Sequence, residues 1–220
     1  LVDLFTFTYD ANRNKTAEQR GGVMANWGYS TGANGYDLKD RLVAWDRTDG
    51  NQDQSWTLTY EGDWHDFTDA GTHQQRTHGP AHELTAIDGT GLTYDAKGNL
   101  TQHVTGDTYT WDFDNQLKTA TVSGAVTTMA YDALGRRVSK ASGAAANVYV
   151  SAAQPLAMSP LAGQILAQYP SGTAPSSPSE KWVYGVYIDE PLIKVGTGGT
   201  LYYHANDLFS VSSLTDATPC

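Results

Sequence analysis

The sequence of 220 residues has little of several features that would point to a particular class of protein. Its one cysteine, Cys220, is the last residue, so an internal disulfide framework is excluded. Lys and Arg total 14 against 24 Asp and Glu, which gives a formal net charge of −10. The basic residues form no patch, so nucleic acid is not an expected partner. No apolar run reaches the length of a membrane span, and we expect no membrane insertion.

The chain also lacks an initiator methionine and a signal peptide. It begins with a strand-like stretch and ends within a similar pattern. We therefore expect it to be a piece of a longer protein.

The composition and periodicity favour strands. Glycine accounts for 22 residues and aromatic residues for 11%, which suits strands and tight turns. Apolar and polar residues alternate in "LFTFTYD", "SWTLTY", "DTYTWDFDN" and "EKWVYGVYID". Such alternation predicts strands with one buried face. The inward side chains are predicted to include Phe5, Phe7, Tyr9, Trp56, Leu58, Tyr60, Tyr109, Trp111 and Phe113. Residues 160–169 fit a short helix or a strand, and we favour the strand.

A short phrase recurs at the ends of these runs: an aromatic residue, an aspartate and a turn. The aromatic residue is predicted to be the last inward residue of a strand. The aspartate begins a turn because its carboxylate can accept hydrogen bonds from nearby backbone N–H groups. A residue that tolerates a left-handed backbone follows, which we expect to be Gly98, Gly135, and either Asn12 or Asn14. The repeat residues are Tyr9, Asp10, Tyr36, Asp37, Tyr94, Asp95, Gly98, Trp111, Asp112, Tyr131, Asp132 and Gly135.

These phrases resemble the YD repeats of the RHS-repeat family. The segment "LYYHANDLFSVSSLTDATPC" (201–220), with Tyr202, Tyr203 and His204, resembles the core segment of that family. The resemblance implies a long β-sheet that spirals into a hollow shell, which encloses a cargo domain in toxin-bearing members. It also implies secretion or a place at the cell surface. The family's self-cleaving aspartate motif and its toxin domain are not in this sequence, and Phe209 stands where a glycine is usual. Only the wall-building role can therefore be carried over.

We predict an all-β fold, in which stacked β-hairpins of YD repeats form a twisted, open or spiralling antiparallel sheet. The expected organisation is one domain over residues 1–220, with ten to fourteen strands. Residues 150–180 are a possible irregular insert, and 201–220 form a C-terminal hairpin that resembles the family's core segment.

The predicted function is architectural, not enzymatic, and requires no cofactor. An open stack of hairpins has two unpaired edges, so the chain is expected to associate head to tail with itself as a shell or filament wall. One alternative is a carbohydrate-binding, adhesive surface module, in which Trp27, Trp45 and Trp64 stack on glycans. The other is an inactive fragment of a polymorphic-toxin shell.

Two stretches have residue types that bind metals. Asp49, Asn51 and Asp53 alternate as in a calcium loop, but the glycine and the distal glutamate that such a loop needs are missing. A hairpin loop is the preferred interpretation. His78 and His82 could hold zinc on a helix, but an intervening Gly-Pro argues against a helix there, and we prefer a polar loop.

A carboxylate pair is also possible. Asp112 and Asp114 would share a face if their segment is a strand, and glycosidases use two carboxylates across a cleft. Alternating aspartates on an outer strand face are more often simply solvated, which is the interpretation we prefer.

Overall fold

The computed structural model describes residues 4–21, 27–51, 53–152, 163–174, 176–186, 190–206 and 209–216. All regular secondary structure in these ranges is β, and no helix in them could cross a membrane. The predicted all-β class is confirmed. The chain divides into two compact units, Leu1–Thr93 and Tyr94–Cys220, and each is described by itself. The grouping of residues 1–220 as one domain stays a prediction.

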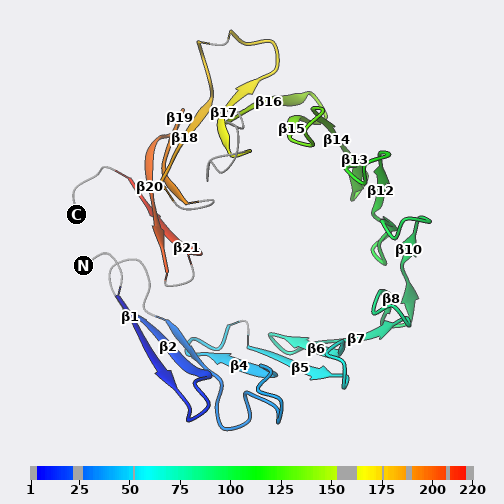
Figure 1. Cartoon of the computed structure of the whole chain (residues 1–220), viewed down its shortest axis with the longest axis vertical. Coiled ribbons are helices and arrows are strands. Elements are labelled where there is room, and N and C mark those ends of the chain that lie inside the picture. Colours follow the sequence, from blue (N-terminus) through cyan, green and yellow to red (C-terminus); the bar gives the residue numbers. More distant parts are fainter. Residues whose placement is uncertain are drawn as a thin grey trace. The chain divides into compact units, whose positions relative to one another are not determined.

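The first unit holds a nine-stranded antiparallel sheet in which each strand pairs with its neighbours in the chain (Figure 1). Its strands are β1 (Leu4–Tyr9), β2 (Lys15–Gly21), β3 (Gly28–Ser30), β4 (Ala44–Arg47), β5 (Gln54–Leu58), β6 (Trp64–Asp69), β7 (Thr72–His78), β8 (Leu84–Ile87) and β9 (Thr90–Gly91).

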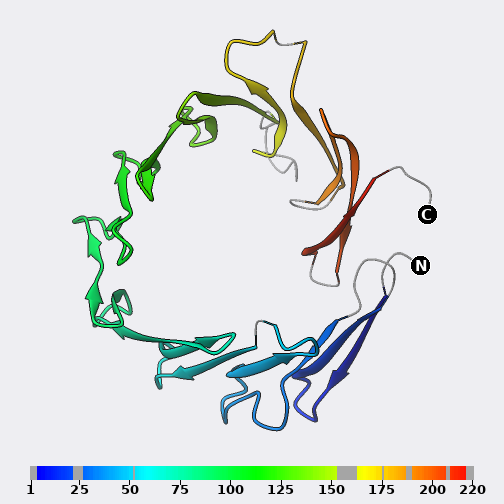
Figure 2. The same ribbon diagram turned by 180° about the vertical axis from the view of Figure 1, so that it is seen from behind.

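The second sheet has twelve strands, again in chain order, as the reverse view in Figure 2 also shows. They are β10 (Thr93–Tyr94), β11 (Leu100–Gln102), β12 (Thr108–Trp111), β13 (Leu117–Val122), β14 (Ala125–Tyr131), β15 (Arg137–Ser142), β16 (Ala145–Ser151), β17 (Ile165–Pro170), β18 (Glu180–Tyr184), β19 (Pro191–Gly196), β20 (Gly199–Ala205) and β21 (Val211–Thr215).

Several details differ from the expectation. The described residues form 21 strands, more than the ten to fourteen predicted, because polar strands such as β7 and short strands such as β11 lack apolar alternation. Within 150–180, β17 and part of β18 are regular strands, while residues 153–162 and 175 lie outside the described residues. The strand favoured for 160–169 is confirmed from Ile165 onward. The C-terminal hairpin is formed by β20 and β21, with Tyr202 paired to Thr215.

Two-residue turns connect several of the hairpins. In Ala70–Gly71, Asp88–Gly89 and Ser123–Gly124, both residues have positive φ, between 46° and 81°. This is the type I′ turn, whose twist matches that of antiparallel strands. Glycine is needed at its second position because a side chain there would strain the left-handed backbone.

The sheets are single layers. Within each unit, the extensive contacts of each described strand are with its neighbours in the chain. The only buried apolar residues among those described are Ile87, Ala120 and Ala167. The accessible surface is 13937 Å², whereas two separate compact domains sharing this mass would expose about 12,000 Å² together. The large excess means that side chains are covered mainly by lateral neighbours in the sheet.

Aromatic rings of the first sheet are covered by cations and by one another. In the first sheet, Trp27 lies between the guanidinium groups of Arg20 and Arg47, which are 4.3 and 4.1 Å from its centroid. Trp56 and Phe67 are cross-strand partners with centroids 5.9 Å apart. Cation–π and ring contacts of this kind stabilise a sheet that has no second layer.

Candidate functional site

One border of each sheet carries a series of five-residue turns with the same backbone geometry. In the Asp132 turn, the N–H of Asp132 donates to the carbonyl of Arg136 at 3.0 Å. The N–H of Gly135 donates back to the carbonyl of Asp132, also at 3.0 Å, and Gly135 has φ 78°. This is a type I turn followed by a left-handed residue, which produces a bulge in the ladder. We number its residues 1 to 5, so Asp132 is position 1.

The same pair of backbone hydrogen bonds recurs along the chain. It occurs in turns that begin at Asp10, Asp37, Thr59, Gly79, Asp95, His103, Asp112 and Asn206. Connections in a meander alternate between the two borders of the sheet. All of these turns except the His103 turn therefore lie on one border of their sheet, together with the Asp132 turn in the second sheet. We call each series the turn row.

The aspartate at position 1 caps its own turn. Asp132 Oδ1 accepts from the backbone N–H of Leu134 at 2.9 Å and of Arg136 at 3.0 Å. Asp37, Asp95 and Asp112 accept from the N–H groups at positions 3 and 5 in the same way. Asp10 accepts from position 5 alone among the described contacts. The predicted role of the aspartate is therefore borne out by these hydrogen bonds.

These contacts lower the pKa of three of the aspartates. For Asp132 and Asp95, the largest cause is the hydrogen bond from the side chain at position 5. For Asp37, the largest cause is the backbone N–H at position 5. Each donor favours the ionised carboxylate, so each pKa lies below its ordinary value.

The aromatic residue before the turn binds the preceding repeat. The hydroxyl of Tyr131, the last residue of β14, donates to the carbonyl of Leu117 at 3.0 Å. Leu117 is the residue that directly follows the Asp112 turn. Three equivalent bonds are those from Tyr36 to the carbonyl of Lys15, from the indole N–H of Trp111 to that of Leu100, and from Tyr184 to that of Ile165. The polar group of the ring thus binds the first residue of the strand that follows the preceding turn.

Successive turns also bind each other directly, in two versions. In the first version, an asparagine at position 5 joins its own aspartate to position 4 of the next turn. The side-chain amide of Asn99 donates to Asp95 Oδ2 and to Asn115 Oδ1, both at 2.9 Å. The side-chain amide of Asn14 donates to Asp10 Oδ2 at 3.1 Å and to Asp40 Oδ1 at 2.9 Å in the same arrangement.

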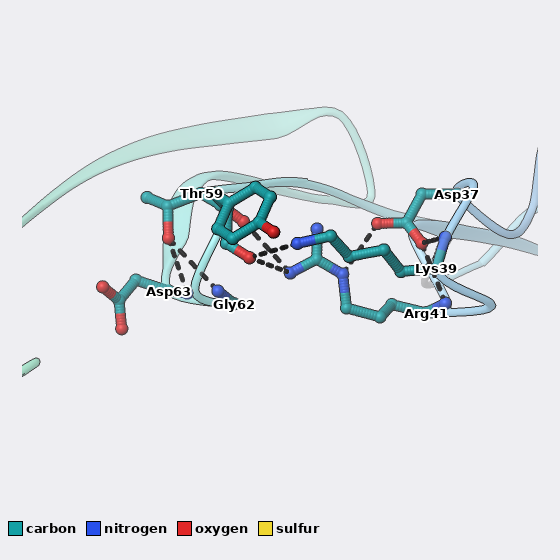
Figure 3. Close-up of polar contacts among 7 residues, drawn as sticks. Asp37, Lys39, Arg41, Thr59, Gly62 and Asp63 are labelled. Atoms are coloured by element: carbon teal, nitrogen blue, oxygen red, sulfur yellow. Dashed lines mark hydrogen bonds and ion pairs between the residues drawn. The ribbon is translucent and has the colours of Figure 1, made fainter.

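In the second version, an arginine at position 5 reaches a backbone carbonyl (Figure 3). Arg41 Nε donates to Asp37 Oδ2 at 2.7 Å, while its Nη1 donates to the carbonyl of Thr59, position 1 of the next turn, at 3.0 Å. Arg136 repeats the scheme, with Asp132 Oδ2 at 2.7 Å from Nε and the carbonyl of Ala152 at 3.1 Å from Nη1.

A lysine at position 3 adds a further link. Lys39 Nζ donates to the carbonyl of Tyr60, position 2 of the next turn, at 2.7 Å, and lies 3.1 Å from the Tyr60 ring centroid. Lys97 Nζ donates to the carbonyl of Phe113, also at position 2, and lies 4.4 Å from that ring centroid. Ammonium groups therefore occupy the same place between turns in both sheets.

Some predicted orientations are wrong. Tyr9 is 55% exposed, and within the described residues no turn precedes that of Asp10. Tyr60 and Phe113 are 79% and 86% exposed, because their strands end before them and both residues stand at position 2 of a turn. The left-handed residue of the first turn is Arg13, with φ 71°, not Asn12 or Asn14.

The remaining repeat residues lie as follows. Tyr94 is half-buried at the end of β10, and Gly98 has φ 84° at position 4. On β20, Tyr202 is 39% exposed on the opposite face from Tyr203, and His204 Nε2 is 2.9 Å from Thr215 Oγ1. These three residues are in a strand and not in a turn.

Phe209 occupies position 4 of the Asn206 turn with φ 58°. This is the left-handed position that favours glycine. A glycine would fit this position better than phenylalanine, in agreement with the glycine that the resemblance led us to expect.

The weaker metal and acid candidates have local partners. Asp49 binds Arg47 Nη2 at 2.6 Å, and Asp53 Oδ1 accepts from the Arg47 N–H at 2.8 Å. Asn51 donates its N–H to Asp49 at 3.1 Å. No group of three His, Cys, Asp or Glu side chains suited to a metal ion occurs among the described residues. Asp112 and Asp114 lie in a turn and not on a strand, so the shared strand face proposed for them is wrong.

Of the two histidines, His82 lies at position 4 of the Gly79 turn, whereas His78 is the last residue of β7 and pairs with Leu84. His82 Nδ1 is 2.9 Å from Asp63 Oδ2, and this bond joins the Gly79 turn to the Thr59 turn. The hydrogen bond from Asp63 raises the pKa of His82 above its ordinary value. The preferred polar-loop interpretation therefore agrees with the position of His82, whereas for His78 it is wrong, because that residue ends a strand.

Of the three tryptophans proposed for glycans, Trp64 is 37% exposed, with Arg76 4.9 Å from its centroid. Trp27 is covered by two arginines, and the indole N–H of Trp45 donates to Gln54 Oε1 at 3.1 Å. Glycan binding stays a prediction.

Sequence reasoning missed the Thr59 and Gly79 turns. The Thr59 hydroxyl replaces the aspartate and accepts from the N–H of Asp63 at 3.0 Å. In the Gly79 turn, Glu83 at position 5 accepts from the N–H of Ala81 at 3.0 Å. Gly62 at position 4 could have indicated the Thr59 turn from the sequence. The Gly79 turn has neither an aspartate at position 1 nor a glycine at position 4, so the sequence did not indicate it.

Comparison with known proteins gives structural neighbours only. No protein-family model matches the chain, and no curated protein matches it. A chain of the Photorhabdus luminescens Tc holotoxin pore with a TccC3 mutation matches with 11% identity and a TM-score of 0.47, over 97% of this chain and 13% of that one. A TcdB2-TccC3-TEV chain matches with 11% identity, over 97% and 11%, and a TM-score of 0.34. A TcdB2-TccC3 chain matches with 12% identity, over 98% and 13%, and a TM-score of 0.32. The chain thus spans about an eighth of the length of these neighbours.

Proposed function

We propose that this chain is a wall segment of an RHS-type, YD-repeat protein, with an architectural and non-enzymatic role at the cell surface or in a secreted particle. The turn row is the observation that carries the proposal. In several steps, the side chain at position 5 of one turn binds the next turn, so these hairpins follow one another in a defined order and orientation. An array with this property extends as a continuous wall.

The single-layer sheets support the same role. Apolar side chains are exposed on one face of the second sheet, among them Val126, Val148, Val150, Val183 and Val195, which are 40% to 50% exposed. A wall meets solvent on one side and contents or further protein on the other, and exposed apolar side chains suit a contact surface.

The outer strands support self-association. Among the described strands, β1 pairs only with β2 and β21 only with β20, so each is an end strand of its sheet. Neither strand sequence, LFTFTY or VSSLT, contains a charge or a proline that would prevent pairing with another chain. We propose that β1 of one copy pairs with β21 of another. Because the two edges differ, the contact is head to tail and produces a ring or a filament.

Light scattering over a wide range of concentration, together with negative-stain microscopy, tests this assembly. The variant Thr6→Lys places a charge on exposed Thr6 of edge strand β1, and we expect it to remain monomeric where the wild type associates. Thr128→Lys is the matched control, since Thr128 is equally classed as exposed but lies on β14, whose two edges are both paired. A wild type that stays monomeric at all concentrations would contradict self-association.

A further inference from the structure

Some steps along the turn row have a place for an ammonium group. In two steps it is filled by the chain itself: Lys39 Nζ binds the carbonyl of Tyr60, and Lys97 Nζ binds that of Phe113. In both cases, the donor is at position 3 of one turn and the acceptor at position 2 of the next. The ring at position 2 covers the ammonium group.

In two other steps, the lysine is replaced by an acid and a cavity lies between the turns. Position 3 is Glu61 in the Thr59 turn and Asp114 in the Asp112 turn. Position 2 of the following turn is Pro80 or Ala133, so the covering ring is also missing. Neither acid makes an ion pair with the residues that the structure describes.

The two cavities have equivalent linings. The first, of about 550 Å³, is lined by positions 1, 3 and 5 of the Thr59 turn and by positions 1, 2 and 4 of the Gly79 turn. The second, of about 360 Å³, is lined by positions 1, 3 and 5 of the Asp112 turn and by positions 1 and 2 of the Asp132 turn. Both volumes fall within or near the range of small-ligand sites.

We propose that these two cavities bind the primary ammonium group of an aliphatic amine, at the place that lysine occupies in the sister steps. The backbone carbonyl at position 2, from Pro80 or Ala133, accepts one hydrogen bond. The carboxylate at position 3, from Glu61 or Asp114, supplies the opposite charge that Lys39 and Lys97 do not need. A charge-assisted hydrogen bond to a carboxylate is stronger than a neutral one.

The charges around the second cavity agree with a cationic ligand. It is lined by Asp112, Asp114 and Asp132 against one cation, Lys118. The first is less acidic, because Arg76, His65, His78 and His82 line it as well as Glu61 and Asp63. Asp63 pairs with His82, and Arg76 lies 4.9 and 5.2 Å from the ring centroids of two aromatic residues. We therefore expect the second cavity to bind an amine more tightly, aided by the overall charge of −10.

The proposal does not depend on the wall function, since it follows from the repeated geometry of the turns. It is tested by an NMR titration of the ¹⁵N-labelled chain with n-butylammonium chloride, which matches a lysine side chain. We expect saturable shifts of the Leu134 and Ala81 amides, whose peptide groups contain the two acceptor carbonyls. Tetramethylammonium chloride at the same ionic strength has no N–H donor and is expected to produce no saturable shift.

Variants separate the two cavities. Asp114→Lys places a lysine in the second cavity and is expected to abolish the shift of Leu134 while leaving that of Ala81 unchanged; Glu61→Lys has the reverse effect. Asp114→Asn keeps the size of the side chain and is expected to weaken binding without filling the cavity. The dispersion of each spectrum shows whether the variant is folded.

Nα-acetyl-lysine methylamide tests the source of the amine: binding as tight as that of butylammonium indicates a lysine of another chain, and weaker binding indicates a free amine. Shifts that grow linearly and equally with both ammonium salts would overturn the proposal.

Discussion

Replacing Tyr131 by phenylalanine isolates the contribution of the repeat's aromatic residue. The change deletes the hydroxyl that donates to the carbonyl of Leu117 at 3.0 Å and leaves the ring in place. A typical intramolecular hydrogen bond contributes about 0.5–1.5 kcal/mol net, so we expect a loss of about 1 kcal/mol in the free energy of unfolding. For a chain of this size, that loss lowers Tm by about 2–4 °C.

The matched control is Tyr202→Phe. Tyr202 is 39% exposed on the opposite face of the sheet, and its hydroxyl makes no hydrogen bond within the described part of the chain. We expect the free energy of unfolding of this variant to lie within about 0.5 kcal/mol of that of the wild type, as is usual for surface substitutions.

Urea unfolding followed by tryptophan fluorescence measures both variants, since the chain has six tryptophans. Hydrogen exchange adds a local readout, and we expect faster exchange in β13 and β14 for Tyr131→Phe alone. If Tyr131→Phe and Tyr202→Phe are equally stable, then the hydrogen bond from Tyr131 to the previous hairpin does not contribute to stability, and only the packing of the ring does.

Three further changes test the turns. The pKa of Asp132 lies below its ordinary value of 3.8, and its ionised carboxylate stabilises the fold fully only above that ordinary value. Urea midpoints of the wild type should therefore fall as the pH drops through the pKa of Asp132. Asp132→Asn should flatten this pH dependence, and an unchanged slope would contradict the role of the Asp132 carboxylate in capping its turn. Gly135→Ala and Gly124→Ala place a side chain at φ 78° and 81°, and each should cost about 1–2 kcal/mol in urea unfolding; neutral substitutions would disprove the left-handed backbone. The pKa of His82 is raised above 6.5 by Asp63, so the stability this pair provides is present below pH 6.5 and is lost as the pH rises through the raised pKa. The stability difference between the wild type and His82→Gln should therefore shrink from acidic to alkaline pH, and a constant difference would exclude the ion pair.

The turn chemistry could be predicted from the sequence because it is local. An aspartate can accept hydrogen bonds from N–H groups two and four residues later, and a glycine at position 4 adopts the left-handed backbone, as Asp132 and Gly135 do. Both signals lie within five consecutive residues. The all-β class followed for a similar reason, since alternation is also a local property.

The contacts between turns could not be predicted, because they join residues about 16 to 28 positions apart. The Thr59 and Gly79 turns carry no aromatic–aspartate phrase, so the sequence showed no rule for which turns are partners. The exposed rings at position 2 were misassigned for a related reason. Alternation continues past the end of the strand in the letters, while the bulge ends it in the structure, as Phe113 shows.

Contacts confined to neighbours in the chain also affect how the protein is made. Every hairpin finds its partner among residues already synthesised, so a nascent chain can fold in step with its emergence from the ribosome, without waiting for its C-terminus. Low contact order of this kind favours fast folding and shortens the time during which bare strands are exposed to aggregation.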